Sequence, residues 1–289
     1  MKYFYLVIDT NILCCYLASK WIENFDGLPN FKGILVREDK PSDEILQQRK
    51  EFHAKYAESK LNDEISREFL SLYPDFDEIV ESAIRLFGIP KYSITDYHQT
   101  IFLGRNLNGE SAKNWLKETC KNSQPYFFSY QEQILKTWWI EISQRQIINC
   151  HPAVLPYARG IYPLENIAIL KDIDKFREAA GVTIHYIDEG VDTGPIIRAE
   201  KIIDPFQFNS IWELKAYLYV TGNNVYVKTA KEILSDQDMV PAGVVPNPQL
   251  TSRNFLSKDF TPEKRELAEA AYLSMKNYVC REKTQSSSI

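Results

Sequence analysis

The chain has 289 residues, of which 44 % are apolar and 25 % charged, as is typical of a globular protein that can bury a sizeable core. Its net charge of −5 and pI of about 5.6 argue against a protein whose main task is to grip nucleic acid, because phosphate binding needs concentrated positive charge. The five cysteines are irregularly spaced without a Cys-x-x-Cys pair, so neither a disulfide framework nor a cysteine-rich zinc site is expected.

The first residues predict a buried strand. The apolar run from Tyr3 to Ile8 ends in Asp9, and it is too short for the apolar core of a signal peptide or for a membrane span. We therefore expect a cytoplasmic protein without a membrane partner. A helix over about 12–24 and a second strand over 31–36 follow.

The segment from Pro41 to about Phe87 is mostly helical in pattern and heavily charged, which predicts two or three amphipathic helices with solvated charged faces. We interpret this segment as an insertion. Beyond it, short strands and helices are expected in alternation, with strands at 91–95, 126–130 and 145–150 and helices at 111–120 and 131–142.

The last third of the chain continues this alternation. It predicts strands at 181–188 and 195–199, a long helix over 210–235 with a break at 222–224, and a last helix over 262–278.

Strands that alternate with helices predict an α/β fold with an open, mostly parallel sheet and helices on both faces. We expect one catalytic domain over 1–240, with a helical insertion at about 41–87. A C-terminal extension over 241–289 is expected to end in a helix.

Polar side chains emerge at the end of the strand expected at 145–150. The run reads Ile-Ile-Asn-Cys-His-Pro-Ala-Val-Leu-Pro from Ile147 onward. Asn149 and His151 are two residues apart, so on a strand they point to the same face, and Pro152 then ends the strand. An amide and an imidazole therefore lie side by side at the carboxyl end of a strand, where ligands of open α/β sheets bind.

A second polar group follows in the segment from Gly181 to Ile197. Its apolar alternation stops at a loop with three acids in five residues, and the loop ends in Asp192. Gly190 and Gly194 allow backbone conformations that most residues cannot adopt, so this loop can bring Asp192 back to the sheet edge. Each residue alone has an ordinary explanation as a cap or turn former, and the argument depends on their combination and order.

The combination Asn-x-His-Pro-x-x-Leu-Pro, followed by Gly-x-Thr-x-His-x-x-Asp-x-x-x-Asp-x-Gly-Pro-Ile-Ile, resembles the signature of folate-dependent formyltransferases. This family includes glycinamide ribonucleotide formyltransferase, methionyl-tRNA formyltransferase, formyltetrahydrofolate hydrolase and sugar N-formyltransferases. The resemblance covers about residues 126–205, is weak before 125 and is nearly absent after 240. Between the two motifs, four further positions agree with the family: Gly160, Pro163, Leu164 and Ala168.

The resemblance implies a Rossmann-like formyltransferase fold, 10-formyltetrahydrofolate as formyl donor, and Asn149, His151 and Asp192 as catalytic residues. Elementary chemistry agrees. Attack of an amine on a formyl group creates an oxyanion, to which Asn149 Nδ2 can donate a hydrogen bond. His151, charged beside a carboxylate, can donate a second bond and pass a proton to N10 of the folate. Asp192 orients this histidine and helps to collect the proton that the amine loses.

The resemblance also implies that the folate lies between residues 129–135 and the loop 187–192. The implied binding residues are Gln133, Ile134, Leu135, Ile187, Asp188, Glu189 and Asp192. Two alternatives stay open: Ile134 and Leu135 could instead be helix core, and Asp188 and Glu189 could be solvated loop acids. His185 also matches a family position, and we interpret it as structural.

The sequence departs from the family after the first strand. Ribonucleotide-binding members carry a glycine-rich loop there for the substrate phosphate, whereas Asp9-Thr10-Asn11 contains no glycine. Glycinamide ribonucleotide is therefore a poor candidate substrate, and this cluster is expected to cap the next helix. About 50 residues follow Met239, too few for the separate domain of tRNA-modifying members, and nothing resembling the regulatory domain of the hydrolases precedes Tyr3.

The leading hypothesis is formyl transfer to a primary amine of a small molecule, such as an amino sugar, an amino acid or a specialised metabolite. The alternatives are a formyltetrahydrofolate hydrolase, a folate-binding protein without activity, and a dinucleotide-dependent oxidoreductase, against which the missing Gly-x-Gly-x-x-Gly argues. No metal is implied, because no third ligand is spaced beside His151 and Asp192. The aromatic residues of 210–235 are explained equally well by a homodimer and by packing within one chain.

Overall fold

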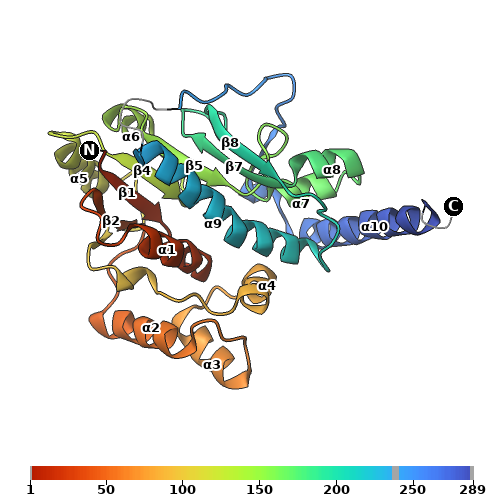
Figure 1. Ribbon diagram of the computed structural model, residues 1–289, viewed down its shortest axis with the longest axis horizontal. Helices are drawn as coiled ribbons and strands as arrows, with labels where there is room; N and C mark the ends of the chain where they lie inside the picture. The colour runs from red at the N-terminus through yellow and green to blue at the C-terminus, as the bar shows by residue number, and fades with distance from the viewer. Residues whose placement is uncertain (1, 236–240, 287–289) are drawn as a thin grey trace.

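A seven-stranded sheet forms the centre of the computed structural model, which describes residues 2–235 and 241–286 (Figure 1). The order across the sheet is β3 (Thr100–Phe102), β2 (Phe31–Val36), β1 (Phe4–Ile8), β4 (Tyr126–Tyr130), β5 (Ile147–His151), β7 (Gly181–Tyr186) and β8 (Ile196–Lys201). The first five strands are parallel, and β7 and β8 are antiparallel to their neighbours. The predicted α/β fold with a mostly parallel sheet is confirmed.

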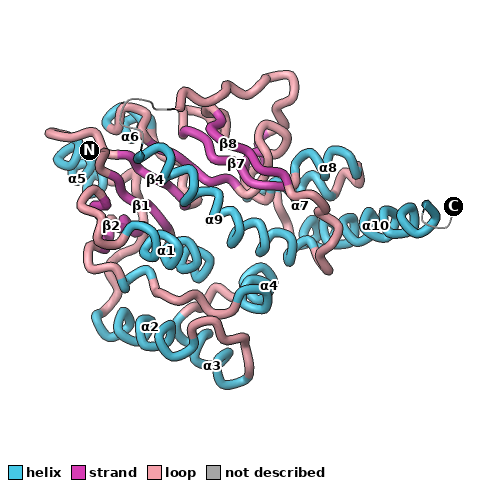
Figure 2. The backbone as a smooth tube through the Cα atoms, in the orientation of Figure 1, coloured by secondary structure: helices cyan, strands magenta, loops and turns pink. Residues whose placement is uncertain are grey.

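Helices cover both faces of this sheet (Figure 2). On one face, α1 (Ile12–Phe25) and α9 (Ile211–Ser235) pack over Phe4, Leu6 and Ile8 of the first strand. On the other face, α5 (Glu110–Cys120) and α6 (Thr137–Ile142) cover Val7 and Phe127. The alternation of buried side chains along β1 and β4 therefore supplies two cores, one above and one below the sheet.

The expected insertion forms three helices, α2 (Asp43–Tyr56), α3 (Asp63–Leu72) and α4 (Glu78–Phe87). Each helix begins at a polar residue whose side chain accepts a hydrogen bond from a backbone N–H of the first turn, namely Ser42, Asn62 and Asp77. Helix α4 packs along α9, which ties the insertion to the main body.

The C-terminal extension also packs against the main body. A two-residue strand β9 (Asn254–Phe255) pairs with β6 (Arg159–Gly160), and α10 (Pro262–Ser286) packs on α7 (Pro163–Ala168) beside α8 (Ile173–Ala179). Within α10, Tyr272 is fully buried, and its hydroxyl donates to the carbonyls of Pro205 at 2.8 Å and Phe208 at 3.0 Å. The division at residue 240 into domain and extension stays a prediction, and residues 236–240 lie outside the described part.

Some predicted elements are wrong in type or length. Residues 131–136 form a loop rather than the first half of a helix, because the Gln131 side chain hydrogen-bonds to both the N–H and the carbonyl of Gln133. The strand expected at 91–95 is instead a 3₁₀ turn, Ile94–Asp96, which a reciprocal cap between Ser93 and Asp96 fixes.

Two helices are longer or more continuous than expected. Helix α9 runs without a break through 222–224, and the absence of a side chain at Gly222 lets it lie close to Val182 of β7. The last helix extends to Ser286. Tyr226 and Trp212 of α9 are buried within this chain, so packing accounts for these two aromatic residues. No helix among residues 2–235 and 241–286 is long and apolar enough to cross a membrane.

Replacement of Tyr272 tests whether the extension is part of the core. Tyr272→Ala should lower the free energy of unfolding by about 3–5 kcal/mol, because a buried aromatic ring is lost. Tyr272→Phe keeps the ring and loses only the hydroxyl, so we expect about 1–2 kcal/mol. Urea unfolding followed by fluorescence measures both. Equal, negligible effects of the two variants would show that α10 does not contribute to the main fold.

His53 of α2 should make stability depend on pH. Its Nδ1 lies 2.7 Å from the carbonyl oxygen of Pro90 and its Nε2 lies 2.7 Å from the Tyr73 hydroxyl, and burial lowers its pKa from 6.5 to about 4. The unfolded chain therefore binds a proton at a higher pH than the folded chain does. As the pH falls from 6.5 to 4, this histidine should reduce the free energy of unfolding by about 2–3 kcal/mol.

Urea titrations at pH 7 and pH 4 on wild type and His53→Gln measure this effect, since glutamine does not titrate in this range. The wild type should lose about 2–3 kcal/mol more than the variant over this interval. Replacement of the exposed His98 by glutamine is the matched control and should behave like the wild type. Parallel curves for wild type and His53→Gln would contradict the assignment.

Candidate active site

Asn149 and His151 are brought to one side of the sheet by strand β5. Asn149 pairs in register with Ser129 of β4 and with His185 of β7, and His151 pairs with Thr183. Cys150 between them is buried against α9, with its Sγ 4.0 Å from the Gly222 carbonyl. The strand alternation thus places an apolar residue in the core and the two polar residues toward the opposite side.

Asp192 returns to the sheet edge through the loop that joins β7 to β8. Its backbone has a positive φ of 51°. The Asp188 side chain fixes the loop by accepting from the Gly190 N–H at 3.1 Å and the Thr193 hydroxyl at 2.7 Å. At Gly194 a Cβ atom would lie 1.9 Å from the Tyr186 carbonyl oxygen, so a side chain does not fit there. The predicted return of Asp192 therefore depends on these local contacts.

The carboxylate of Asp192 contacts both nearby histidines. Its Oδ2 lies 3.5 Å from Nδ1 of His151 and accepts a hydrogen bond from the Gly160 N–H at 2.8 Å. Its Oδ1 lies 3.5 Å from Nε2 of His185. The structure therefore brings Asn149, His151 and Asp192 together as the sequence predicted, and it adds His185 to the group.

His185 does more than fill the core, although it is buried. Its Nδ1 lies 2.8 Å from the carbonyl oxygen of Tyr186, and its Nε2 lies 3.2 Å from Nδ2 of Asn149. With the ring proton on Nδ1, Nε2 accepts from one N–H of the Asn149 amide. The second N–H of that amide is then left for a ligand, so His185 orients the Asn149 amide.

The titration behaviour follows from burial and charge. Burial raises the pKa of Asp192, but the adjacent His151, the contact with His185 and the Gly160 N–H outweigh this and hold the pKa well below its usual value. Burial lowers the pKa of His151 more than the charge of Asp192 raises it. At neutral pH the free site thus pairs an ionised carboxylate with a neutral imidazole, which differs from the charged histidine expected from the sequence.

The two ring nitrogens of His151 have different surroundings. Nε2 lies 2.9 Å from the carbonyl oxygen of Ala158, which is buried and does not line the cavity. The ring proton of the neutral form therefore resides on Nε2 and is donated to this carbonyl. Nδ1 faces Asp192, which does line the cavity, and keeps a free lone pair. Nδ1 is the atom that can take up a proton from a ligand.

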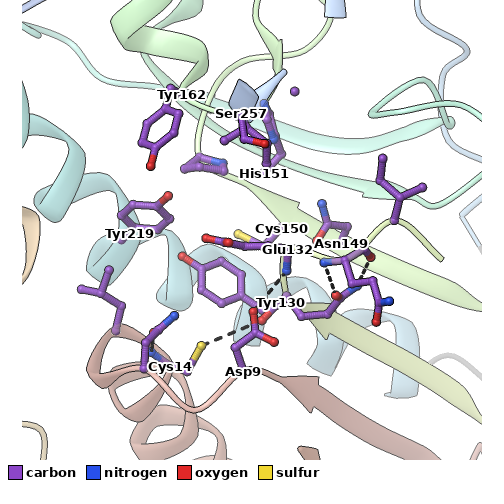
Figure 3. A pocket seen from close by; sticks show the side chains of 18 of the residues that line it. Asp9, Cys14, Tyr130, Glu132, Asn149, Cys150, His151, Tyr162, Tyr219 and Ser257 are labelled. Carbon is purple, nitrogen blue, oxygen red and sulfur yellow. Dashed lines mark hydrogen bonds between the residues drawn. The ribbon is translucent and has the colours of Figure 1, made fainter. Parts of the chain in front are cut away.

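A cavity of about 1200 Å³ lies in front of these residues (Figure 3). Five of the residues implied for folate binding line it together with Asp192, namely Gln133, Ile134, Leu135, Ile187 and Asp188. Leu135 is also buried against the α5–α6 core, whereas Ile134 is 64 % exposed. Glu189 is not part of the lining, and it forms an exposed ion pair with Arg145 at 3.0 Å.

Further parts of the cavity lining come from segments that no sequence motif connected to the site. The loop before α4 (residues 74–77), residues 254–258 of the extension and the turn after β1 all line it. Its polar side chains include Glu132, Tyr130, Tyr162, Lys215 and Tyr219 (Figure 3 labels all but Lys215). The sequence did not indicate Glu132 or Lys215 as site residues. Both lie in segments expected to be helical, where a charged residue is normally interpreted as part of a solvent-exposed helix face.

The turn after β1 confirms the predicted cap and adds an ion pair. The Asn11 side chain accepts from the Cys14 N–H at 3.0 Å and so caps α1. Asp9 forms two hydrogen bonds with the Arg37 guanidinium, at 2.5 and 2.8 Å. A carboxylate thus stands at the end of β1, beside the beginning of α1.

The sequence model of the family described as formyl transferase matches residues 115–228. Residues 115–228 are thus similar to the formyl transferase family. A relative in curated proteins, phosphoribosylglycinamide formyltransferase of Bacillus subtilis (strain 168), is 34 % identical over 89 residues, which are 31 % of this chain and 43 % of the relative. The chain thus spans less than half of the length of this formyltransferase.

Solved formyltransferase structures share the fold. An N-formyltransferase from Helicobacter canadensis matches with a TM-score of 0.52 and 16 % identity over 90 % of this chain and 73 % of the other. A sugar 3N-formyl transferase matches with a TM-score of 0.53 and 15 % identity over 90 % and 72 % of the two chains. The formyltransferase type of Rossmann-like fold expected from the sequence is confirmed by these likenesses.

No group of three or more His, Cys, Asp or Glu side chains that could hold a metal ion is found within residues 2–235 and 241–286. The prediction that the site uses no metal stays a prediction.

Gly194→Ala should disturb the Asp192 loop, because its Cβ meets the Tyr186 carbonyl. We expect a loss of about 1–3 kcal/mol in unfolding free energy, together with weaker binding of 5-formyltetrahydrofolate as measured by calorimetry. Gly109→Ala is the control, since its Cβ would come no closer than 3.1 Å to any atom outside its neighbours. If Gly194→Ala behaves like Gly109→Ala in both measurements, the loop does not need the close approach described above.

Proposed function

We propose that this protein is an N-formyltransferase that moves a formyl group from 10-formyltetrahydrofolate to a primary amine of a small molecule. The observation that carries the proposal is the convergence of Asn149, His151 and Asp192 on the wall of one cavity of about 1200 Å³. This volume exceeds that of a typical ligand pocket and suits a folate together with an acceptor. The similarity of residues 115–228 to the formyl transferase family supports the same reaction class.

The folate donor fits the end of the cavity where Ile134, Leu135 and Ile187 offer apolar surface beside the polar Gln133. Gln133 itself is fixed, since its side chain accepts from the Leu107 N–H and donates to Asn106, each at 2.8 Å. The Helicobacter canadensis relative holds folinic acid and dTDP-3-aminofucose in its crystal structure. A folate of this kind would supply the formyl carbon in the present site.

The reaction then depends on groups of this chain. The N–H of Asn149 that His185 leaves free donates to the formyl oxygen, where negative charge develops as the amine attacks. His151 accepts the proton of the attacking amine on Nδ1, and Asp192 stabilises the imidazolium that results. His151 then returns this proton to the departing nitrogen of the donor. A neutral His151 at neutral pH suits this order of proton transfers, because the histidine must first accept a proton.

Three features of the proposal come from the sequence alone and stay predictions. They are a cytoplasmic location, the absence of a nucleic-acid partner, and the oligomeric state, for which a homodimer remains an alternative to a monomer.

Single substitutions test the catalytic assignment. Asn149→Ala, His151→Asn and Asp192→Asn should each lower the rate of formyl transfer by about 100- to 1000-fold, because each removes one hydrogen-bond or proton-transfer group. The rates are measured from tetrahydrofolate absorbance and from the mass of formylated product, with 10-formyltetrahydrofolate and a panel of primary amines. Binding of 5-formyltetrahydrofolate by the same variants separates loss of chemistry from loss of folding.

His98→Asn is the matched control for His151→Asn, because His98 is exposed and outside the cavity lining. It should keep wild-type rates. Turnover of the folate without any amine would assign the chain to the hydrolases instead. Binding of the folate without turnover, unchanged by all three substitutions, would leave only a folate-binding protein.

A further inference from the structure

Glu132 places an uncompensated carboxylate inside the cavity. It follows β4 by two residues, and its backbone N–H donates to Asp9 Oδ2 at 3.2 Å, which fixes the loop. Figure 3 shows its side chain directed into the open space, on the side of Tyr130 and Tyr219. Among the described residues, its carboxylate oxygens have no hydrogen-bond or ion-pair partner, and the side chain lines the open cavity with part of its surface exposed to solvent.

The cations nearest to Glu132 are already neutralised by other carboxylates. Arg37 is held by both oxygens of Asp9. Lys215 forms a buried ion pair with Glu165. Of the remaining cations in the lining, Arg105 pairs with Asp39 at 3.2 Å and Lys258 is exposed. Glu132 is therefore a carboxylate of the lining that no cation of the described residues pairs with.

Titration shifts agree with this geometry. Burial and the charge of Asp9 raise the pKa of Glu132, against the opposing effects of Arg37 and Lys215. Burial raises the pKa of Tyr130 and of Tyr219, and the charge of Glu132 adds to both shifts. A cation bound at Glu132 would oppose the smaller, charge-dependent part of these shifts, whereas burial is the larger cause of each.

The turn after β1 places negative charge in the same part of the cavity. Asp9 sits at the end of β1, and Asn11 already accepts the Cys14 N–H of the first turn of α1, which removes one donor that an anion could use. A phosphate placed here would face the carboxylates of Asp9 and Glu132 together. An ammonium group would instead meet Glu132 and the aromatic rings of Tyr130 and Tyr219. The centroids of these two rings lie 6.1 Å apart, and the ring planes are at 88° to each other.

From these observations we propose that Glu132 determines acceptor specificity by binding a positively charged group of the amine substrate, remote from the amine that is formylated. The acceptor is then a small diamine or diamino sugar without phosphate at this end. This inference rests on the proposed function, since Glu132 can select an acceptor only if the protein transfers a formyl group. The binding of the amine can nevertheless be tested without turnover.

The test uses three acceptors with one skeleton: 1,4-diaminobutane, 1-aminobutane and 4-aminobutyl phosphate. Each is titrated by calorimetry into wild-type protein saturated with 5-formyltetrahydrofolate. The wild type should bind the diamine about 10- to 100-fold more tightly than 1-aminobutane and should bind the phosphate most weakly, as expected for one charged hydrogen-bonded contact. Equal binding of the first two amines, or tightest binding of the phosphate, would overturn the inference.

Two variants locate the effect. Glu132→Gln should weaken diamine binding about 10- to 100-fold and leave binding of 1-aminobutane and of the folate within about twofold. Glu132→Lys should reverse the order of diamine and phosphate. Glu118→Gln, which removes an exposed carboxylate on α5 outside the lining, is the control and should change nothing. An equal loss for all amines in Glu132→Gln would also overturn the inference.

Turnover separates this inference from the proposed function. Diamine-selective binding without formylated product would retain the role of Glu132 and reject the transferase. Formylation of all three amines at the same kcat/KM would retain the transferase and reject the role of Glu132.

Discussion

The contact between Asp192 and His151 is the constraint around which the site is arranged. It joins the end of β5 to the loop between β7 and β8, and so requires the antiparallel pairing of these strands to be in register. The same carboxylate also contacts His185, which in turn holds the Asn149 amide. A shift of β7 by one residue would turn His185 to the other face of the sheet and remove it from the Asn149 amide and from Asp192. The chemistry therefore depends on sheet register as much as on the identity of the three residues.

The sequence predicts this part of the molecule well because its signals are local. Asn149 and His151 alternate on a strand that Pro152 ends, and the glycines around Asp192 mark the returning loop. Both patterns survive in the structure. The protonation of His151 was not predictable in this way, since it depends on burial by segments far away in the chain.

The acceptor end of the cavity could not be predicted, because tertiary packing assembles it. Residues 74–77 of the insertion and 254–258 of the extension meet there, with Tyr162 and Tyr219 from two other elements. No sequence spacing relates them. Glu132 could not be predicted for a different reason. The apolar pattern after Tyr130 favoured a helix, whereas the side-chain hydrogen bonds of Gln131 stabilise a loop, and this loop places Glu132 in the cavity lining. Reaction class and acceptor choice are thus encoded at different levels of the structure.

The central claim is that the formyl group passes from folate to an amine within this site. The most direct measurement follows an isotopically labelled formyl carbon of 10-formyltetrahydrofolate through a single turnover in the presence of each amine of the panel, 1,4-diaminobutane included. Label in the formamide product, equal in amount to the tetrahydrofolate formed, is the expected result. Label recovered as free formate, or left on the folate, would contradict the account.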